Sequence, residues 1–250
     1  MCFNMSIVTE LMALEEEFGT IFDTYPAYAS TDGRLIYHQR SGFSHPAWPI
    51  LPASEAPKLS SGFWGLVPHW TKDRTSALEI QNKTLNARSE TVRSLPSFRT
   101  AMKQQQRCLI PVSGFFEPHS YQDKSYPFYL HRRGALFALG GIFDIWYGPE
   151  SGKQYRSFSV LTAPSVGIVD AIHNKKHRMP LLIEKESYAT WLDPSTDPDT
   201  INELMTSRES DLCAHPVSKQ LYGRSELAIA PEVRELSYYG IDAIDNLTVL

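Results

Sequence analysis

The second residue of the chain is a cysteine, and its position gives it two reactive groups at once. Cysteine is small enough for the initiator Met1 to be removed, which would leave Cys2 with an α-amine beside its thiol. An α-amine with a pKa of about 7.7–8.0 can condense with an aldehyde, and the neighbouring thiol can then close a thiazolidine ring. A thiol alone needs activation at pH 7. The alternative is an incidental cysteine in a frayed terminus.

Asn86 and Arg88 stand close together in the segment 86–91 (NARSET). An asparagine amide can bind an amine or a sugar hydroxyl through its donor and its acceptor. An arginine offers a bidentate fork to a phosphate group. The segment therefore fits a sugar-phosphate site, and it fits equally well a turn followed by a helix cap.

Glu117 ends the apolar stretch 111–118 (PVSGFFEP). A carboxylate flanked by aromatic residues and proline is poorly solvated, which raises its pKa toward the range of general acid–base catalysis. The alternative is a surface glutamate at the end of a strand.

Two histidines, His173 and His177, lie among basic residues in the loop 171–180 (AIHNKKHRMP). Histidine titrates near neutral pH and suits a general acid, and a neighbouring arginine such as Arg178 suits a phosphate anchor. We expect no metal, because no second cluster of His, Cys or carboxylates has metal-ligand spacing. We expect no cofactor either.

Basic and aromatic residues gather near these segments. The net charge of −4 argues against general nucleic-acid binding, yet residues 81–110 are strongly basic and include Arg99. Trp70 precedes that segment, and aromatic rings among basic residues can stack unpaired nucleobases. The alternatives are solvated surface charges and core aromatics, and we assign Trp64 to the core.

Strands and short helices have to position these residues. Apolar periodicity and capping residues predict helices over 6–18, 165–172 and 184–192, the first ending at Gly19. Strands are predicted over 35–38, 62–68, 108–116 with a bend at Gly114, 158–162 and 179–183. Residues 128–131 and 135–146 are predicted to pair across 132–134. Residues 45–49 are predicted to form a surface loop, and 84–107 to be partly helical.

The composition is that of a globular protein, with 42% hydrophobic and 21% charged residues among 250. Strands and helices do not alternate regularly, and no linker divides the chain. We predict an α+β fold in one domain over 1–250, a twisted, mostly antiparallel sheet or open barrel with flanking helices. Its core would cover roughly 2–195, with the C-terminal tail packed on it.

Cysteine usage and apolar patterning bear on the compartment. Three cysteines without a CxxC pair argue against a disulfide framework. The amino-terminal segment has no signal-peptide pattern, and no apolar stretch approaches the length of a membrane span. We expect a cytoplasmic monomer without membrane contact, associated with the nucleoid if bacterial.

In their order along the chain, these segments resemble the SRAP (SOS response-associated peptidase) family of abasic-site processing proteins. The match covers roughly residues 1–195. It consists of Met1-Cys2 and of 64–68 (WGLVP), 86–88 (NAR), 107–111 (RCLIP), 114–117 (GFFE), 161–163 (LTA), and 172–173 (IH) with 178–180 (RMP). Each part is weak, but the ordered set of seven is specific.

The resemblance implies that the protein crosslinks to abasic sites in single-stranded DNA, with peptidase and lyase-like chemistry. Cys2 is then the nucleophile, and Asn86 positions its amine and the sugar. Glu117 moves protons during removal of Met1 and during crosslinking. His173 assists opening of the sugar ring and Schiff-base chemistry.

The DNA itself is expected to lie in a groove of the sheet. The resemblance implies that Arg88 and Arg178 bind phosphates beside the lesion. The basic segment and the aromatic cluster add Arg99 and Trp70 to the expected DNA contacts.

The chain departs from the family pattern at two places. Family members usually begin Cys-Gly-Arg, whereas Phe3 and Asn4 follow Cys2 here. Family members also place one residue between the histidine and Arg-Met-Pro, whereas four residues separate His173 from Arg178. We assign the family's histidine to His173 because the Ile-His pair comes with it, and His177 is the alternative.

Two other functional classes stay open from the sequence. The first is a non-catalytic single-stranded DNA-binding module in which Cys2 is incidental. The second is a cysteine hydrolase using Cys108, which is disfavoured because Cys108 heads an apolar strand, where a cysteine usually packs as a small hydrophobic residue. The crosslinking hypothesis predicts that Cys2, Asn86, Glu117 and one histidine converge in one cleft.

Overall fold

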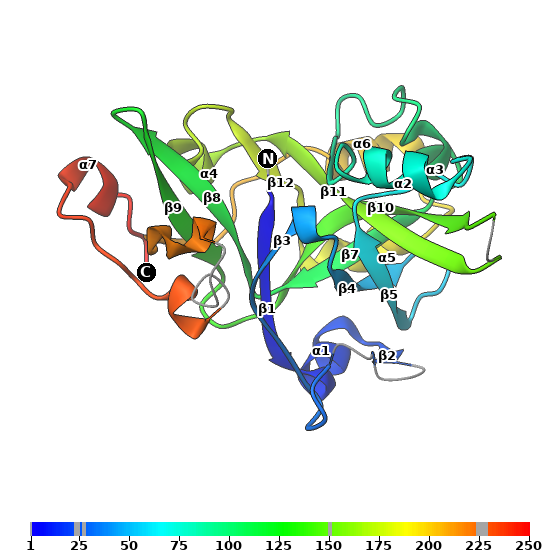
Figure 1. Ribbon diagram of the computed structural model, residues 1–250, viewed down its shortest axis with the longest axis horizontal. Helices are drawn as coiled ribbons and strands as arrows, with labels where there is room; N and C mark the ends of the chain where they lie inside the picture. Colours follow the sequence, from blue (N-terminus) through cyan, green and yellow to red (C-terminus); the bar gives the residue numbers. More distant parts are fainter. Residues whose placement is uncertain (1, 23–25, 27–28, 150–151, 224–229) are drawn as a thin grey trace.

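Two mostly antiparallel sheets carry the fold in the computed structural model, which describes residues 2–22, 26, 29–149, 152–223 and 230–250 (Figure 1). Within these residues the smaller sheet has five strands in the order β14-β9-β8-β1-β3. Their bounds are β1 Asn4–Glu10, β3 Arg34–Ser41, β8 Gly114–Tyr121, β9 Lys124–His131 and β14 Cys213–Pro216. The prediction of an α+β fold with mostly antiparallel sheets is confirmed.

The larger sheet closes into a small barrel. Strands β11, β10, β7, β4 and β5 pair in that order, and β5 then pairs in parallel with β11, which completes the ring. The barrel strands are β4 Ala47–Pro52, β5 Lys58–Trp64, β7 Arg107–Val112, β10 Phe137–Tyr147 and β11 Gln154–Pro164. Short strands extend it: β2 Ile21–Phe22, β6 Asn86–Arg88, β12 Arg178–Pro180 and β13 Leu182–Ile183.

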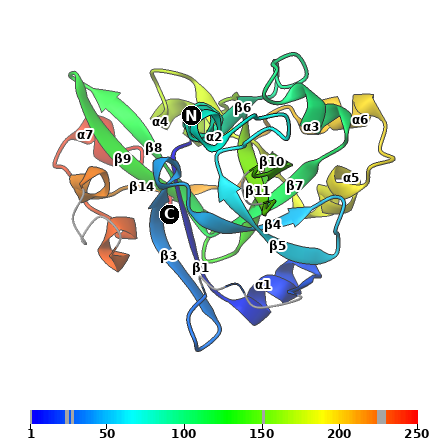
Figure 2. The ribbon, with the colours of Figure 1, turned by 45° about the vertical axis from the view of Figure 1, so that its right-hand side comes forward.

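Short helices flank the two sheets (Figures 1 and 2). The α-helices are α1 Leu11–Phe18, α2 Arg74–Gln81, α3 Arg99–Lys103, α4 Gly167–Ile172, α5 Tyr188–Leu192, α6 Pro198–Leu204 and α7 Asp242–Asp245. The 3-10 turns are η1 Gly42–Ser44, η2 Lys185–Ser187, η3 Lys219–Tyr222 and η5 Pro231–Arg234. No helix in the described part of the chain is long and apolar enough to cross a membrane.

The predicted helix over 6–18 is wrong in its first half. Residues up to Glu10 form β1, between β3 and β8, and the helix begins at Leu11. The β-branched run Ile7-Val8-Thr9 favours a strand, and two neighbouring strands supply its hydrogen bonds. The predicted end holds, because Gly19 caps the helix in a left-handed conformation with φ 59°.

The predicted strand over 108–116 is divided between the two sheets. Strand β7 belongs to the barrel and β8 to the smaller sheet, and Ser113 lies between them. Gly114 marks the crossing as expected. A Cβ at this position would meet the Tyr129 ring at 2.5 Å, so only glycine fits.

Two further local predictions are wrong. The segment 45–49 is not a surface loop, because it leads into β4 and buries Trp48 completely. Strands β9 and β10 belong to different sheets, and the predicted pairing between them is reduced to one bridge between Arg132 and Ala135.

The core is continuous across both sheets and includes three fully buried tryptophans, each with its indole N–H bonded to a backbone carbonyl. Trp48 donates to Pro111 at 2.9 Å, Trp64 to Leu85 at 2.8 Å, and Trp191 to Cys108 at 3.0 Å. Burial of an indole is favourable when its polar N–H is satisfied in this way. The assignment of Trp64 to the core is confirmed.

Candidate active site at the amino-terminal cysteine

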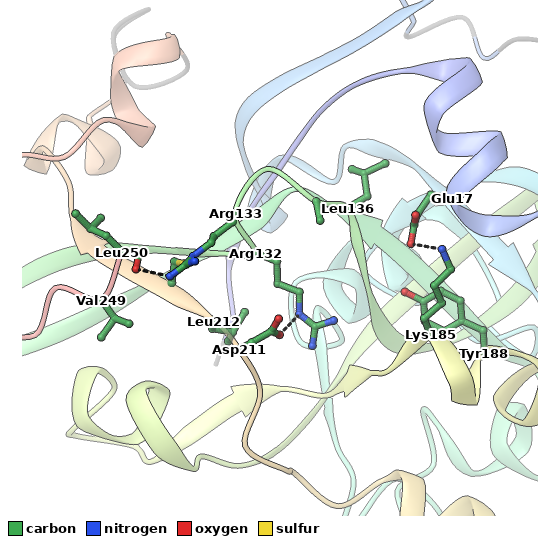
Figure 3. A pocket seen from close by; sticks show the side chains of 12 residues that line it. Glu17, Arg132, Arg133, Leu136, Lys185, Tyr188, Asp211, Leu212, Val249 and Leu250 are labelled. Atoms are coloured by element: carbon green, nitrogen blue, oxygen red, sulfur yellow. Dashed lines mark hydrogen bonds and ion pairs between the residues drawn. The ribbon is translucent and has the colours of Figure 1, made fainter.

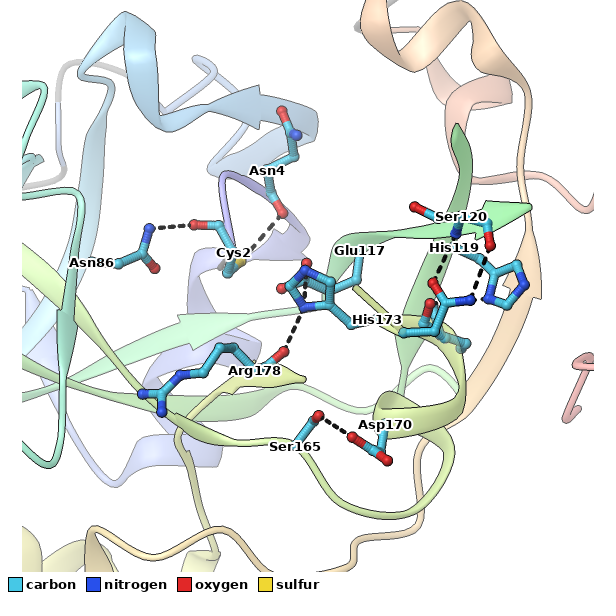
Figure 4. Close-up of polar contacts among 12 residues, drawn as sticks. Cys2, Asn4, Asn86, Glu117, His119, Ser120, Ser165, Asp170, His173 and Arg178 are labelled. Carbon is cyan, nitrogen blue, oxygen red and sulfur yellow. Dashed lines mark hydrogen bonds and ion pairs between the residues drawn. The ribbon is translucent and has the colours of Figure 1, made fainter. Parts of the chain in front are cut away.

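Cys2 lies two residues before the start of β1, between Asn86 on one side and Glu117 and His173 on the other (Figure 4). Pairing of Asn4 with Phe116 brings this end of β1 beside the part of β8 that carries Glu117. Asn86 approaches from β6, and its Nδ2 donates to the Cys2 carbonyl oxygen at 2.8 Å. The Cys2 thiol donates to the Asn4 carbonyl at 3.6 Å. Three segments far apart in the sequence therefore meet at Cys2.

Glu117 forms the floor of the site, with its side chain fully buried. Burial raises the pKa of this carboxyl from 4.5 to about 7, although the charge of Lys176 opposes the rise. Near neutral pH the group therefore exists in both protonation states. It can give a proton in one step and take one in the next.

His173 caps the C-terminal end of α4 and contacts Glu117, with 3.4 Å between its Nδ1 and Glu117 Oε2. Its Nδ1 also lies 2.6 Å from the Arg178 carbonyl oxygen. A carbonyl can only accept a hydrogen bond, so Nδ1 carries the proton and Nε2 keeps the lone pair. Burial lowers the pKa of His173 to about 4. The ring is therefore neutral at pH 7.

His177 lies apart from this cluster. Its backbone is left-handed, with φ 48°, and its half-exposed ring pairs with Asp170 at 2.7 Å. The longer loop between His173 and Arg178 carries His177 outward, so His173 is the histidine in contact with Glu117.

The Cys2 thiol is kept in its protonated form. Burial raises the pKa of this thiol well above its usual range, and the nearby charge of Glu117 raises it further. The Cys2 side chain is also fully buried, so the free thiol has little access to reagents in solution. The arrangement favours chemistry that starts at the α-amine and involves the thiol afterwards.

Asn174 and His119 hold the histidine loop against β8, and the sequence pattern gave neither of them a role. Asn174 Oδ1 accepts from the Ser120 N–H at 3.0 Å, and its Nδ2 donates to the Ser120 carbonyl at 2.9 Å. His119 Nδ1 lies 3.1 Å from the Ile172 carbonyl. These contacts fix the end of α4, and with it His173, beside Glu117 (Figure 4). The sequence signal that could have identified Asn174 is an amide side chain directly after a candidate catalytic histidine.

Arg178, predicted to bind phosphate, lies largely buried between β12, β11 and the segment after β6. Its guanidinium pairs with both carboxylate oxygens of Glu90, one of them at 3.0 Å. It also donates to the Thr162 carbonyl oxygen at 2.6 Å. These bonds join the Asn86 segment to the strand that follows the histidine loop.

We therefore expect Arg178 to act mainly by holding the site together. Arg178→Ala should lower the free energy of unfolding by roughly 1.5–3 kcal/mol, the range for hydrogen bonds to charged groups, and leave the salt dependence of DNA binding unchanged. Arg88→Ala should leave stability within about 0.5 kcal/mol and reduce the log–log salt slope of the binding constant by about 1. Thermal melts and fluorescence anisotropy at several salt concentrations measure both. A reduced slope with an unchanged melting temperature in Arg178→Ala would contradict this assignment.

The other predicted DNA contacts lie on the surface. Arg88 is exposed at the end of β6. Arg99 is exposed at the start of α3, a helix that lies on the barrel, away from the N-terminus in both ribbon views. Trp70 is 47% exposed, beside His69, whose N–H donates to Asp144 at 3.0 Å. Arg88 and Trp70 are thus available to a strand on the surface, and all three roles stay predictions.

Two alternatives to this site receive no structural support. Cys108 is fully buried in β7 and its thiol pKa is raised by burial, so it packs as a hydrophobic residue, as expected.

A larger cavity of about 600 Å³ lies elsewhere, and predicted site residues are absent from its walls (Figure 3). Four of its charged groups form two ion pairs, Lys185 with Glu17 at 3.0 Å and Arg132 with Asp211 at 3.0 Å, and Arg133 donates to the Leu250 carbonyl oxygen at 2.9 Å. Among the described residues, no three His, Cys, Asp or Glu side chains are arranged to hold a metal ion.

With this geometry established, comparison with known proteins settles the family. The family model for SOS response associated peptidase (SRAP) matches residues 1–222. The chain belongs to the SRAP family. The resemblance seen in the sequence is thereby confirmed, and the match extends beyond residue 195.

Relatives of this SRAP protein include bacterial and vertebrate proteins. It is 31% identical over 182 residues to the abasic site processing protein YoqW of Bacillus subtilis, and the aligned region covers 68% of this chain and 77% of the relative. It is 27% identical over 175 residues to the abasic site processing protein HMCES of Gallus gallus, covering 62% of this chain and 51% of that one. A crystal structure of a Bacteroides thetaiotaomicron protein superposes with a TM-score of 0.84 at 26% identity, covering 95% of this chain and all of the other.

This SRAP protein departs from the family pattern at positions 3 and 4, and the structure shows what these two residues contact. Phe3 packs on Phe43, with ring centroids 5.1 Å apart, and Phe43 is 55% exposed. Asn4 accepts a hydrogen bond from Gln39 Nε2 at 2.5 Å. The departure from the family pattern therefore replaces a cation beside Cys2 with an aromatic pair and a neutral amide.

Proposed function

We propose that this SRAP protein processes abasic sites in single-stranded DNA and becomes covalently attached to them through Cys2. The observation that carries the proposal is the convergence of Asn86, Glu117 and His173 on the residue whose amine and thiol can together capture an aldehyde. Two of the relatives, YoqW and HMCES, are named abasic site processing proteins, which supports the same substrate.

The first step is removal of Met1, which lies outside the described residues. Hydrolysis of the Met1–Cys2 peptide bond consumes one water and releases the Cys2 α-amine. Glu117 is the candidate general base for that water, because a carboxyl with a pKa of about 7 is partly ionised at neutral pH. An aminopeptidase of the cell could perform the same hydrolysis, and the later steps do not depend on which one does so.

The second step is capture of the ring-opened sugar. As the ring opens to the aldehyde, the bond between C1 and the ring oxygen breaks, and the C1 hydroxyl gives its proton to the Nε2 lone pair of neutral His173. The protonated His173 then returns this proton to the ring oxygen, which becomes a hydroxyl group. The Cys2 amine adds to the aldehyde carbon, and the carbinolamine loses water when protonated Glu117 donates a proton. Asn86 keeps the Cys2 backbone in place through its hydrogen bond to the carbonyl oxygen.

The third step closes the ring. The thiol sulfur adds to the carbon of the C=N bond, and its proton passes to the Glu117 carboxylate, which returns to its starting state. Aldehyde, amine and thiol give one thiazolidine and one water, so no oxidant or reductant is required. The high pKa of the thiol matters little here, because the thiol is deprotonated as it attacks.

The DNA strand is proposed to run over the surface beside Cys2, with Arg88 on a phosphate and Trp70 against a base. The protein would act as a monomer where the DNA is, in the cytoplasm or on the nucleoid of a bacterium.

The proposal is tested by incubating the protein with an oligonucleotide that carries one abasic site. We expect a heat-stable, slower-migrating adduct whose mass equals protein without Met1 plus DNA minus one water. Protein with confirmed removal of Met1 that binds the oligonucleotide and never forms the adduct would instead identify a non-catalytic single-stranded DNA-binding module.

The hydrogen bond from Asn86 gives a first quantitative prediction. Asn86→Ala should slow adduct formation roughly 5- to 10-fold, because one hydrogen bond of about 1–1.5 kcal/mol that orients Cys2 is lost. Affinity for undamaged single-stranded DNA should not change. Asn82→Ala, at an exposed asparagine just after α2, is the matched control. Single-turnover rates with an abasic oligonucleotide measure the effect, and equal rates for both variants would exclude this role.

A further inference from the structure

A second cleft adjoins the site on the side of Cys2 away from Asn86. It has a volume of about 190 Å³, and Glu117 and His173 line its inner end. Phe3, Lys175, Lys176 and Tyr222, which are all more exposed than Glu117 and His173, also line it. The proposed mechanism uses only the inner end, so the aromatic and cationic part of the cleft has no role in it.

Tyr222 is fixed in place although its ring is accessible. The preceding residue, Leu221, is buried in a small cluster with Phe116 and Tyr129, which anchors η3 to the smaller sheet. The Tyr222 hydroxyl lies 3.4 Å from Ser125 Oγ, and the side chain is 48% exposed. Partial burial raises the pKa of the Tyr222 phenol, and the charge of Glu117 adds to this rise.

The two lysines give the cleft a positive charge. Both belong to the longer loop between His173 and Arg178, and within the described residues neither forms an ion pair. Lys176 is near enough to Glu117 to lower the pKa of that carboxyl. An aromatic wall with adjoining cations matches the chemistry of an unpaired nucleotide, in which a flat base carries a phosphate.

We propose that this cleft binds the nucleotide next to the abasic site, with its base stacked on Tyr222 and its phosphate at Lys175 and Lys176. The inference rests on the proposed function, because the lesion at Cys2 is what places a neighbouring nucleotide here. Asn86, in the same short strand β6 as Arg88, approaches Cys2 from the side opposite Glu117 and His173 (Figure 4), so the DNA strand is proposed to run from β6 to η3. A base that stacks on Tyr222 is not stacked in a duplex, and the subsite therefore selects single-stranded DNA on that side of the lesion.

The test removes the base from the DNA and the ring from the protein, separately and together. Each oligonucleotide carries one tetrahydrofuran lesion, a stable analogue of an abasic site that cannot form the adduct. In two further oligonucleotides, a second tetrahydrofuran replaces the adjacent nucleotide on the 5′ or the 3′ side. For wild type, we expect one of these two losses to weaken binding roughly 5- to 150-fold, the range for one stacked base. Tyr222→Ala should bind the oligonucleotide with its base weaker by a similar factor and show no further loss when the base is removed.

Two variants serve as controls, and a third tests the phosphate contact. Tyr222→Phe keeps the ring and should behave as wild type, and Tyr147→Ala removes a tyrosine that is 61% exposed at the end of β10 and should have no effect. Lys176→Gln should reduce the salt slope by about 1. Thermal melts check that each variant folds.

The outcomes separate this inference from the proposed function. Wild type that forms the adduct with a natural abasic site but is indifferent to both neighbouring bases would overturn the subsite alone. So would a base-dependent loss that persists in Tyr222→Ala. Wild type that forms no adduct would overturn the proposed function, whatever the tetrahydrofuran oligonucleotides show.

Discussion

Cys2→Ala should form no detectable heat-stable adduct with an abasic oligonucleotide. The variant keeps an α-amine after removal of Met1, so a Schiff base can still form, but without a thiol the ring cannot close. We expect an adduct only after reductive trapping with borohydride. Gel electrophoresis with and without the reductant measures this, and the effect is the loss of the whole heat-stable signal.

Binding supplies the control for this variant. Cys2 is fully buried, and alanine leaves a small cavity, so affinity for undamaged single-stranded DNA should stay within about 2-fold of wild type while the melting temperature falls slightly. A heat-stable adduct from Cys2→Ala at the wild-type level would show that another residue is the nucleophile.

Glu117→Gln is the second variant with a large expected effect. Gln cannot accept or donate the proton that the proposed mechanism moves, so adduct formation should slow by about 10²–10⁴-fold. The rate of wild type should change with pH near 7, where Glu117 titrates, and again near the pKa of the α-amine. Glu117→Gln should lose the first inflection and keep the second. A profile that retains both would remove Glu117 from the proton transfers.

Glu117→Gln should also change how the free energy of unfolding depends on pH. Between the ordinary pKa of 4.5 and the raised value of about 7, the folded protein binds more protons at Glu117 than the unfolded chain does. This group therefore makes the free energy of unfolding fall as pH rises through that window. Gln does not titrate, so Glu117→Gln should gain stability relative to wild type from pH 4.5 to 7, reaching on the order of 3 kcal/mol above pH 7. Denaturant unfolding at pH 4 and pH 8 measures the difference.

The sequence allowed the chemistry of the site to be predicted better than its architecture. Cys2, Asn86, Glu117 and His173 were identified because reactive residue types stood in an ordered set of segments, and the structure brings them together. The strand over residues 6–10 was missed because a local pattern with helical spacing does not reveal that β3 and β8 lie on either side. Long-range pairing decided that element, as it decided the separation of β9 from β10.

The same limit applies to individual side chains. An arginine near a predicted phosphate site looks like a phosphate ligand, and only the fold shows that Arg178 already has a carboxylate partner in Glu90, 88 residues away in the sequence. The place of Tyr222 in the cleft could not be predicted for the same reason, because η3 lies beyond the residues 1–195 on which the resemblance rested and is positioned by the packing of Leu221 against Phe116 and Tyr129.

The place of Cys2 just before a strand that is paired on both sides has a mechanical consequence. Only Phe3 separates Cys2 from Asn4, whose neighbours in β1 are bonded to β3 on one side and to β8 on the other. Tension on an attached DNA strand would thus load β1 along its length, and the hydrogen bonds on both sides would share the force at once instead of breaking one after another. A motor pulling on such DNA meets an attachment with almost no slack, fixed to a strand that is hydrogen-bonded on both sides.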